Sequence, residues 1–227
     1  MILRRFAHVN LVDTIRQRLA GPLPGVHAHK YFVPSDMPDA AKRLQRAPDD
    51  ARRSAVLVPL LVRPDDDLDV LLTVRTSTLR SHSGQISFPG GRIDDGEDAV
   101  ATALRELDEE TGIPSHDVAV LGTLTPLWVP PSNSAITPVV GLVRAPEAYT
   151  PSEAEVAEIF TVPLSLLLDT SSVHVAPWTL YDRTVQVRHW RVHPSVPLWG
   201  ATAMILNELL ELVRGTPANS MQATIND

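Results

Sequence analysis

The chain has 227 residues, of which 44% are hydrophobic, and it carries a formal net charge of −7 and no cysteine. This length suits one well-filled domain, and the lack of cysteine excludes a thiol nucleophile, a disulfide framework and a cysteine-ligated zinc site. The acidic balance argues against broad nucleic-acid binding, which needs a basic face, and no stretch approaches the ~20 apolar residues of a membrane span.

The first fifty residues predict an extension rather than a separate domain. Residues 11–20 have helical spacing and stop at Gly21 and Pro22, and a proline-rich polar connection follows to about Asp50. We expect this extension, residues 1–50, to pack on a main domain at 51–213, with 214–227 as a polar tail. The first residues lack the apolar core of a secretory signal, so the expected location is cytoplasmic.

Two apolar runs, residues 55–62 and 69–74, predict a pair of strands. The turn between them contains three consecutive aspartates, Asp65 to Asp67. Such a run could be mistaken for a metal site, but in a hairpin turn it more often reflects solvated turn residues.

The segment that follows the second strand carries two arginines, Arg75 and Arg80. Because a guanidinium makes bidentate contacts to phosphate, both are candidates for binding a polyanion; pairing with carboxylates of this acidic protein is the alternative. Phe88 either stacks on a substrate base or anchors the loop in the core, which is the more common role. Gly90 and Gly91 permit a close approach of the backbone.

Residues 91–113 predict a helix with a core-facing side and a crowded acidic arc. The apolar residues share the i, i+3, i+4, i+7 spacing of one helix face: Val100, Ala103, Leu104 and Leu107. Three glutamates lie together beside this face: Glu106, Glu109 and Glu110. Asp95 is the expected N-cap, with Asp98 completing a weak capping box, and Gly112 is the expected left-handed stop.

The acidic arc has two interpretations. A solvated helix face is the common one, but such faces usually interleave cations, and Arg105 is the only cation between Asp98 and Glu110. A hard divalent cation would remove the repulsion, since Mg²⁺ takes carboxylate oxygens together with substrate phosphates. The segment therefore predicts a metal-binding helix.

This segment resembles the Nudix box: Gly, five residues, Glu, seven residues, Arg-Glu, an aliphatic residue, any residue, Glu-Glu, any residue, Gly and an aliphatic residue. The nine specified positions are all met, at Gly91, Glu97, Arg105, Glu106, Leu107, Glu109, Glu110, Gly112 and Ile113. The resemblance implies a strand–loop–helix–loop motif that binds Mg²⁺ or Mn²⁺ and hydrolyses a diphosphate linked to another moiety.

Residues 71–91 resemble a second motif, that of the coenzyme A diphosphatase subfamily: Leu-Leu-Thr, any residue, Arg, Ser or Ala, three residues, Arg, three residues, Gly, three residues and Phe-Pro-Gly-Gly. The sequence departs from it only at Thr76. With similar stretches downstream, the resemblance covers roughly residues 54–213. It implies a substrate, coenzyme A or an acyl-CoA, whose cleavage gives adenosine 3′,5′-bisphosphate and 4′-phosphopantetheine, and it favours substrate contacts for Arg75, Arg80 and Phe88.

The remaining elements predict an α/β fold. They are strands at about 118–128, 136–143 and 156–162, a short helix at 164–169, a hairpin over 178–192 through Tyr181 and Asp182, and an amphipathic helix from Trp199 to Val213. Strands interspersed with helices on both sides of the box helix fit a Nudix-type α/β/α sandwich around a mixed β-sheet.

The resemblance assigns roles to the box residues. Glu106 and Glu110 would be the main metal ligands, and Glu109 either a third ligand or the base that deprotonates the attacking water. Arg105 would orient the glutamates and Glu97 would brace loop and helix, although both could be plain salt-bridge residues. The backbone carbonyl of Gly90 would help to hold a metal. Three further glutamates rival Glu109 as the base: Glu153, Glu155 and Glu158.

Two other functions stay open. One is a Nudix hydrolase of another nucleoside diphosphate, such as ADP-ribose or a dinucleotide. The other is a non-catalytic module that binds a nucleotide, although such a module has no chemical reason to keep the complete arginine and glutamate set. In each case we expect a small-molecule partner rather than nucleic acid or membrane. The sequence leaves the oligomeric state open, a homodimer included.

Overall fold

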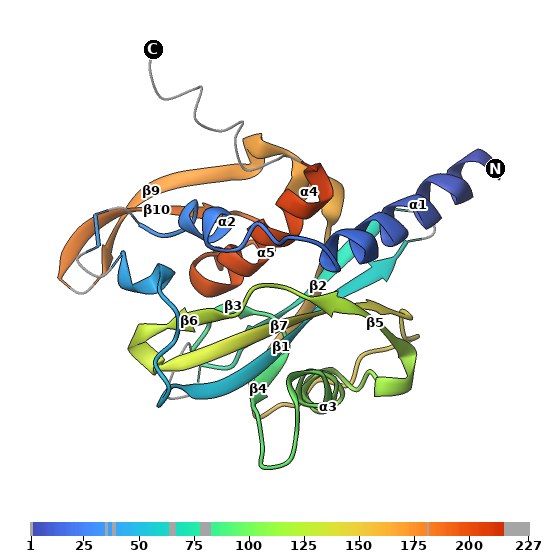
Figure 1. Cartoon of the computed structure of the whole chain (residues 1–227), viewed down its shortest axis with the longest axis horizontal. Coiled ribbons are helices and arrows are strands. Elements are labelled where there is room, and N and C mark those ends of the chain that lie inside the picture. Colours follow the sequence, from blue (N-terminus) through green and yellow to red (C-terminus); the bar gives the residue numbers. More distant parts are fainter. Residues whose placement is uncertain are drawn as a thin grey trace.

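The computed structural model describes residues 2–34, 36–37, 40–63, 67–77, 83–180 and 182–215, with the backbone alone for 2–10. Its centre is a mixed sheet in the order β3-β2-β1-β7-β5 (Figure 1). Strand β1 (Arg52–Val62) runs parallel to β7 (Ser134–Val143) and antiparallel to β2 (Leu68–Arg75). The other strands of this sheet are β3 (Ile86–Ser87), β4 (Gly90–Arg92) beside β1, β5 (Val118–Thr123), β6 (Leu127–Val129) beside β7, and β8 (Val156–Pro163) beside β2.

Helices cover both faces of the sheet (Figure 1). Helix α3 (Ala99–Thr111) lies on one face, and α5 (Gly200–Arg214) lies on the other with α2 (Val26–Lys30) and α1 (Ile2–Leu19). This is the predicted α/β/α sandwich. The remaining elements are α4 (Leu164–Leu168), the hairpin of β9 (Val173–Leu180) and β10 (Arg183–Trp190), and the 3-10 turns η1 (Lys42–Leu44), η2 (Ser115–Asp117), η3 (Pro130–Ser132) and η4 (Thr170–Ser172).

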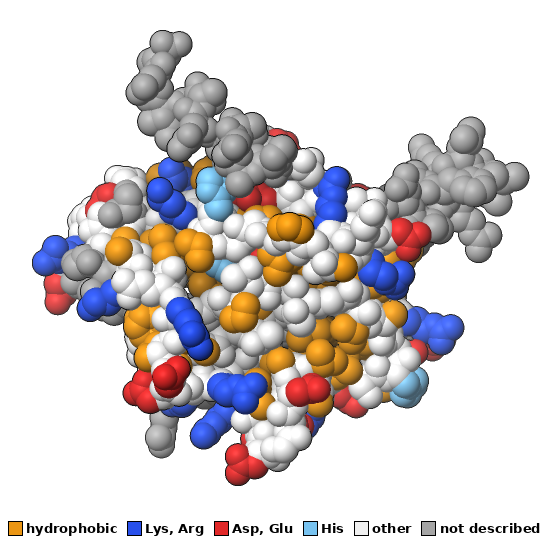
Figure 2. All heavy atoms as spheres, in the orientation of Figure 1, with side chains coloured by type: hydrophobic (Ala, Val, Ile, Leu, Met, Phe, Trp, Pro, Cys, Tyr) orange, Lys and Arg blue, Asp and Glu red, His pale blue; other side chains and the backbone are white. Residues whose placement is uncertain are grey.

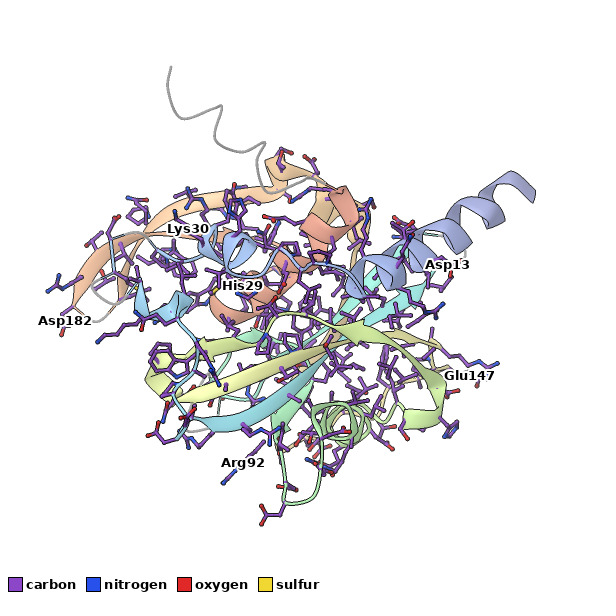
Figure 3. The ribbon with its side chains drawn as sticks, viewed as in Figure 1. Asp13, His29, Lys30, Arg92, Glu147 and Asp182 are labelled. Atoms are coloured by element: carbon purple, nitrogen blue, oxygen red, sulfur yellow. The ribbon has the colours of Figure 1, made fainter. Side chains whose placement is uncertain are left out.

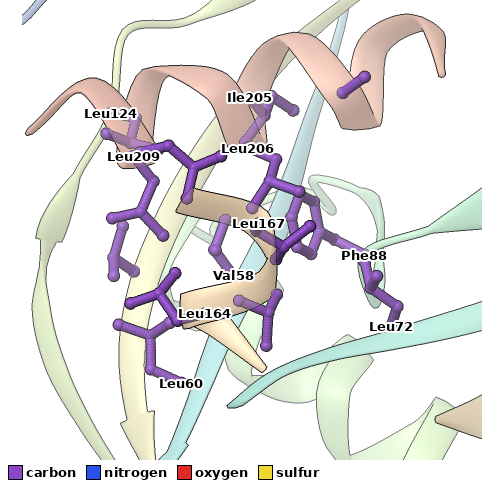
Figure 4. Close-up of a cluster of buried hydrophobic side chains, with 14 of the residues drawn as sticks. Val58, Leu60, Leu72, Phe88, Leu124, Leu164, Leu167, Ile205, Leu206 and Leu209 are labelled. Atoms are coloured by element: carbon purple, nitrogen blue, oxygen red, sulfur yellow. The ribbon is translucent and has the colours of Figure 1, made fainter. Parts of the chain in front are cut away.

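A hydrophobic cluster fills each side of the sheet. On the α3 side, Leu57 and Leu71 of the sheet pack with Leu107. The larger cluster lies under α5, where Val58 and Leu206 belong to the side chains drawn in Figure 4. Because β1 is buried on both faces, it is a continuous apolar run rather than an alternating one. Among the described residues, no helix is long and apolar enough to cross a membrane.

The extension is held against α5 by buried contacts. Val12, Ile15 and Leu19 of α1 belong to the larger core cluster. The ring of Phe32 stacks on Trp190 with ring centroids 4.3 Å apart. His29 of α2 (Figure 3) faces α5, where its Nε2 is 2.8 Å from a carboxylate oxygen of Glu208. Residues from both ends of the described chain therefore form one layer.

Two sequence predictions about the elements need correction. The first helix begins at Ile2 rather than at residue 11. The single strand expected at 118–128 is two strands, β5 and β6, because the backbone breaks before Pro126, which has no N–H for a ladder. Helix α5 is the amphipathic helix expected from Trp199 to Val213, but its polar side is covered, because residues 203–212 are all buried. The hairpin prediction is confirmed in β9 and β10, with Asp182 at φ 59°; Tyr181 lies outside the described residues.

Candidate active site

Helix α3 has a definite cap at each end. Asp98 is the N-cap, and its side chain accepts a hydrogen bond of 2.8 Å from the backbone N–H of Ala101. The prediction of Asp95 was therefore wrong by one turn, because Gly96 adopts φ 89° and the chain turns before the helix begins. Gly112 ends the helix in the left-handed region, as predicted. These caps fix the rotation of α3 and with it the direction of its glutamates.

Arg105 connects the carboxylates of the box. Its Nε donates to Glu97 over 2.9 Å, and its Nη1 donates to Glu106 over 2.8 Å and to Glu109 over 3.0 Å. Hydrogen bonds from Arg105 and then from Thr102 lower the pKa of Glu97 to about 2. This geometry agrees with the orienting and bracing roles expected of Arg105 and Glu97, whose catalytic importance stays a prediction.

Glu110 is the least compensated carboxylate of the site. It is 1% exposed, and neither carboxylate oxygen has a hydrogen-bond partner of good geometry, although the backbone N–H of Gly90 lies near enough to lower its pKa slightly. Arg75 Nη1 lies 3.6 Å from its Oε1, close enough for an ion pair but too far for a hydrogen bond. Burial raises the pKa of Glu110 to about 8. The positive charge of Arg75 lowers this pKa, whereas the negative charges of Glu106 and Glu155 raise it further. Burial also raises the pKa of Glu106.

These two acids fit a divalent cation. Among the described residues, no three His, Asp or Glu side chains stand close enough together to hold a metal ion by themselves. Glu110, however, presents two buried oxygens without partners, and Glu106 lies beside it with a raised pKa. A hard cation with oxygen ligands would compensate both. Glu109 is different, because its side chain is 59% exposed and paired with Arg105.

The rivals of Glu109 as the base differ in position. Glu155 lies near enough to Glu106 and Glu110 to raise the pKa of both. Glu158 is paired with His193 Nε2 over 3.0 Å. Glu153 is exposed on the same segment. Of the three, only Glu155 is shown to lie near the two expected metal ligands, Glu106 and Glu110. The choice between Glu155 and Glu109 as the base stays a prediction.

The backbone at Gly91 makes room for Glu106. A methyl group added to Gly91 would overlap the carboxylate of Glu106, and one added to Gly90 would overlap Ala55 and Val56 of β1. Strand β4 therefore passes close to β1 at Gly90 and to the Glu106 carboxylate at Gly91, and a side chain at Gly91 would displace that carboxylate.

We expect Gly91→Ala to lower kcat by about 10- to 100-fold, because a displacement of a catalytic carboxylate by about 1 Å has effects of that size. The measurement is steady-state hydrolysis with saturating metal. Gly21→Ala is the matched control, since its methyl group would meet only Arg18 O at 3.5 Å. Equal activity of the two variants would contradict the steric argument.

Glu110 also predicts a pH effect on stability without metal. The pKa of Glu110 is about 8 in the folded protein and 4.5 ordinarily. The contribution of this residue to the free energy of unfolding is therefore fully present below pH 4.5 and is lost as the pH rises through about 8. In EDTA, the unfolding free energy of the wild type relative to Glu110→Gln should fall by several kcal/mol, on the order of 4, from about pH 5 to about pH 9. Urea denaturation of both proteins measures this difference, and parallel pH profiles would contradict it.

The structure describes two of the three residues that we expect to contact the substrate, Arg75 and Phe88. Arg75 ends β2 and lies between Glu110 and a large cavity. Arg80 lies outside the described residues. Phe88 is 2% exposed in the larger core cluster (Figure 4) and also contributes to the cavity wall. Its core role is therefore observed, and its contact with substrate stays a prediction.

The cavity has a volume of about 560 Å³ and lies between the sheet and α5. One wall is Arg75 with β3 and β4, and another is the start of α5 at Trp199. The extension supplies a third wall through Phe32, Met37 and Arg43, which the sequence reasoning missed. No local motif marks these residues, because they reach the cavity only through long-range packing. On the face in Figure 2, the described basic side chains are scattered among acidic and apolar ones.

Comparison with known proteins shows the family of the domain that contains α3. The family model described as NUDIX domain matches residues 51–180. An uncharacterized Nudix hydrolase NudL of Photorhabdus laumondii is 40% identical over 78% of this chain and 92% of its own length. The protein of that name in Escherichia coli K12 is 41% identical over 70% of this chain and 81% of its own.

A solved structure supports the fold. The Nudix hydrolase RenU of M. smegmatis superposes with a TM-score of 0.52 at 20% identity, covering 74% of this chain and 88% of its own. The domain match and the relatives at this level of identity together show that the chain belongs to the Nudix hydrolases, enzymes that act on diphosphate bonds with divalent metal ions.

Proposed function

We propose that the chain hydrolyses the diphosphate of coenzyme A or an acyl-CoA, releasing adenosine 3′,5′-bisphosphate and 4′-phosphopantetheine. The observation that carries the proposal is the position of Arg75, the first arginine of the motif over residues 71–91. It lies 3.6 Å from Glu110 and also on the cavity wall. A diphosphate held there would have the acidic helix on one side and the cavity for the nucleotide on the other.

The cavity suits a substrate with both apolar and anionic parts. Its volume of about 560 Å³ lies in the range of small-molecule sites, roughly 300–1,000 Å³. Its lining combines apolar side chains such as Val33 and Met204 with Arg43 and Arg52. Because the whole chain is acidic, an anionic substrate depends on such local arginines.

The proposed roles follow the geometry of α3. Glu106 and Glu110 would hold Mg²⁺ or Mn²⁺, which supplies electrostatic stabilisation to the diphosphate when bound. Arg105 would keep Glu106 and Glu109 in position, with Glu97 bracing it from the preceding loop. Glu109 would take the proton of the attacking water, with Glu155 as the alternative base.

Product analysis tests the proposal. The protein is incubated with coenzyme A and Mg²⁺ or Mn²⁺, in parallel with ADP-ribose, NADH, a dinucleoside polyphosphate and an EDTA control, and products are identified by chromatography and mass. Metal-dependent release of the two expected products, faster than cleavage of the other compounds, supports the proposal. Faster cleavage of another diphosphate would show that this compound, rather than coenzyme A, is the preferred substrate. Cleavage of none would favour the nucleotide-binding module.

A further inference from the structure

Arg43 of η1 is a cavity-wall cation that lacks a protein partner for its buried nitrogen. It lines the cavity, and its Nε is buried without any hydrogen-bond partner. Buried donors in native proteins are nearly always paired. A guanidinium nitrogen withdrawn from water is unfavourable unless an acceptor reaches it. An anion in the cavity would supply that acceptor.

The position of Arg43 separates it from the metal helix. From Arg75 at the end of β2, the sheet continues through β1, β7 and β6, and η1 contacts β6. At about 4.8 Å per strand, the backbones of β2 and β6 lie roughly 14 Å apart. Arg52 at the start of β1 lines the cavity between these ends, and its guanidinium donates to the carbonyl of Ser132. The cavity therefore has a second cationic end.

Resting on the proposed function, we propose that Arg43 binds a phosphate monoester of the substrate, which in coenzyme A is the 3′-phosphate, with Arg52 of the same cavity adding positive charge. Arginine matches a phosphate through two parallel hydrogen bonds. The extension also contributes the apolar side chains of Phe32 and Val33 to the cavity lining, which suit the adenine that carries this phosphate. Arg43 is then a specificity-determining residue that lies outside the matched domain at 51–180.

The test compares two substrates, coenzyme A and 3′-dephospho-coenzyme A. Arg43→Ala should lower kcat/KM for coenzyme A by about 10- to 100-fold, the size expected for a lost charge-assisted contact. It should change kcat/KM for the dephospho compound by less than about twofold, and Arg43→Lys should recover part of the loss. Arg46→Ala is the matched control, because Arg46 is exposed on the same segment. An equal loss on both substrates would overturn the assignment.

A binding measurement separates this proposal from the proposed function. In EDTA, titration calorimetry compares adenosine 3′,5′-bisphosphate with adenosine 5′-monophosphate on wild type and Arg43→Ala. A preference for the bisphosphate that the variant loses supports the subsite, even if coenzyme A is not cleaved. Cleavage of coenzyme A together with an undiminished preference in Arg43→Ala would overturn the subsite and leave the function standing. Circular dichroism of the variant checks that the fold is retained.

Discussion

Glu110→Gln should lower kcat by at least about 10³-fold while the fold persists. The reason is the state of this carboxylate in the protein. It is buried, both of its oxygens lack hydrogen-bond partners, and burial raises its pKa to about 8. Burial disfavours the ionised form of this carboxylate, and a bound cation would stabilise that form. Glutamine has nearly the same shape as glutamate but cannot supply the negative charge.

The measurements for Glu110→Gln are metal-dependent turnover and Mn²⁺ binding by calorimetry. Asp108→Asn is the control, because Asp108 is an exposed acid on the same helix, and its activity should stay within about twofold of the wild type. Circular dichroism should show an intact fold, and the metal-free variant should be more stable than the wild type at alkaline pH. Turnover of Glu110→Gln near the wild-type level would remove the metal-helix account.

The parts of the site that the sequence predicts are local. The apolar face of α3, its left-handed end at Gly112 and the close approach at Gly91 depend on residues within one segment. Even there, the choice between Asp95 and Asp98 as N-cap could not be made from residue type, because aspartate suits both positions. The turn at Gly96 decides it, and that turn is a property of the folded backbone.

The parts that the sequence did not predict depend on long-range packing. The sequence of α5 has the pattern of a helix with one solvent-exposed face, which would carry Asn207, Glu208 and Glu211. All three are buried, because the extension, about 180 residues earlier in the chain, covers that face. The same packing brings Arg43 to the cavity. A single sequence shows which residues are polar, but it does not show which distant segment will pair with them.

The second large effect is expected at this covered face: Glu208→Ala should lower the free energy of unfolding by about 3–5 kcal/mol, because it removes a buried carboxylate that serves several polar groups at once. Glu208 is 0% exposed. It accepts hydrogen bonds from the Gly25 N–H over 3.0 Å and the Thr125 hydroxyl over 2.6 Å, and it faces His29 at 2.8 Å. Alanine would leave the buried Gly25 N–H and His29 ring without this partner, together with the partly buried Thr125 hydroxyl.

Urea denaturation of Glu208→Ala and Glu208→Gln measures this effect, with Glu147→Ala as the control at an exposed site (Figure 3). Glutamine keeps one oxygen for Gly25 and Thr125, so its loss should be about 1–2 kcal/mol. Hydrogen exchange should rise in residues 25–34 of Glu208→Ala more than in α3, since the lost contacts hold the extension. If Glu208→Ala unfolds no more easily than Glu147→Ala, the extension is held by its apolar contacts alone, and the polar residues of α5 do not explain its attachment.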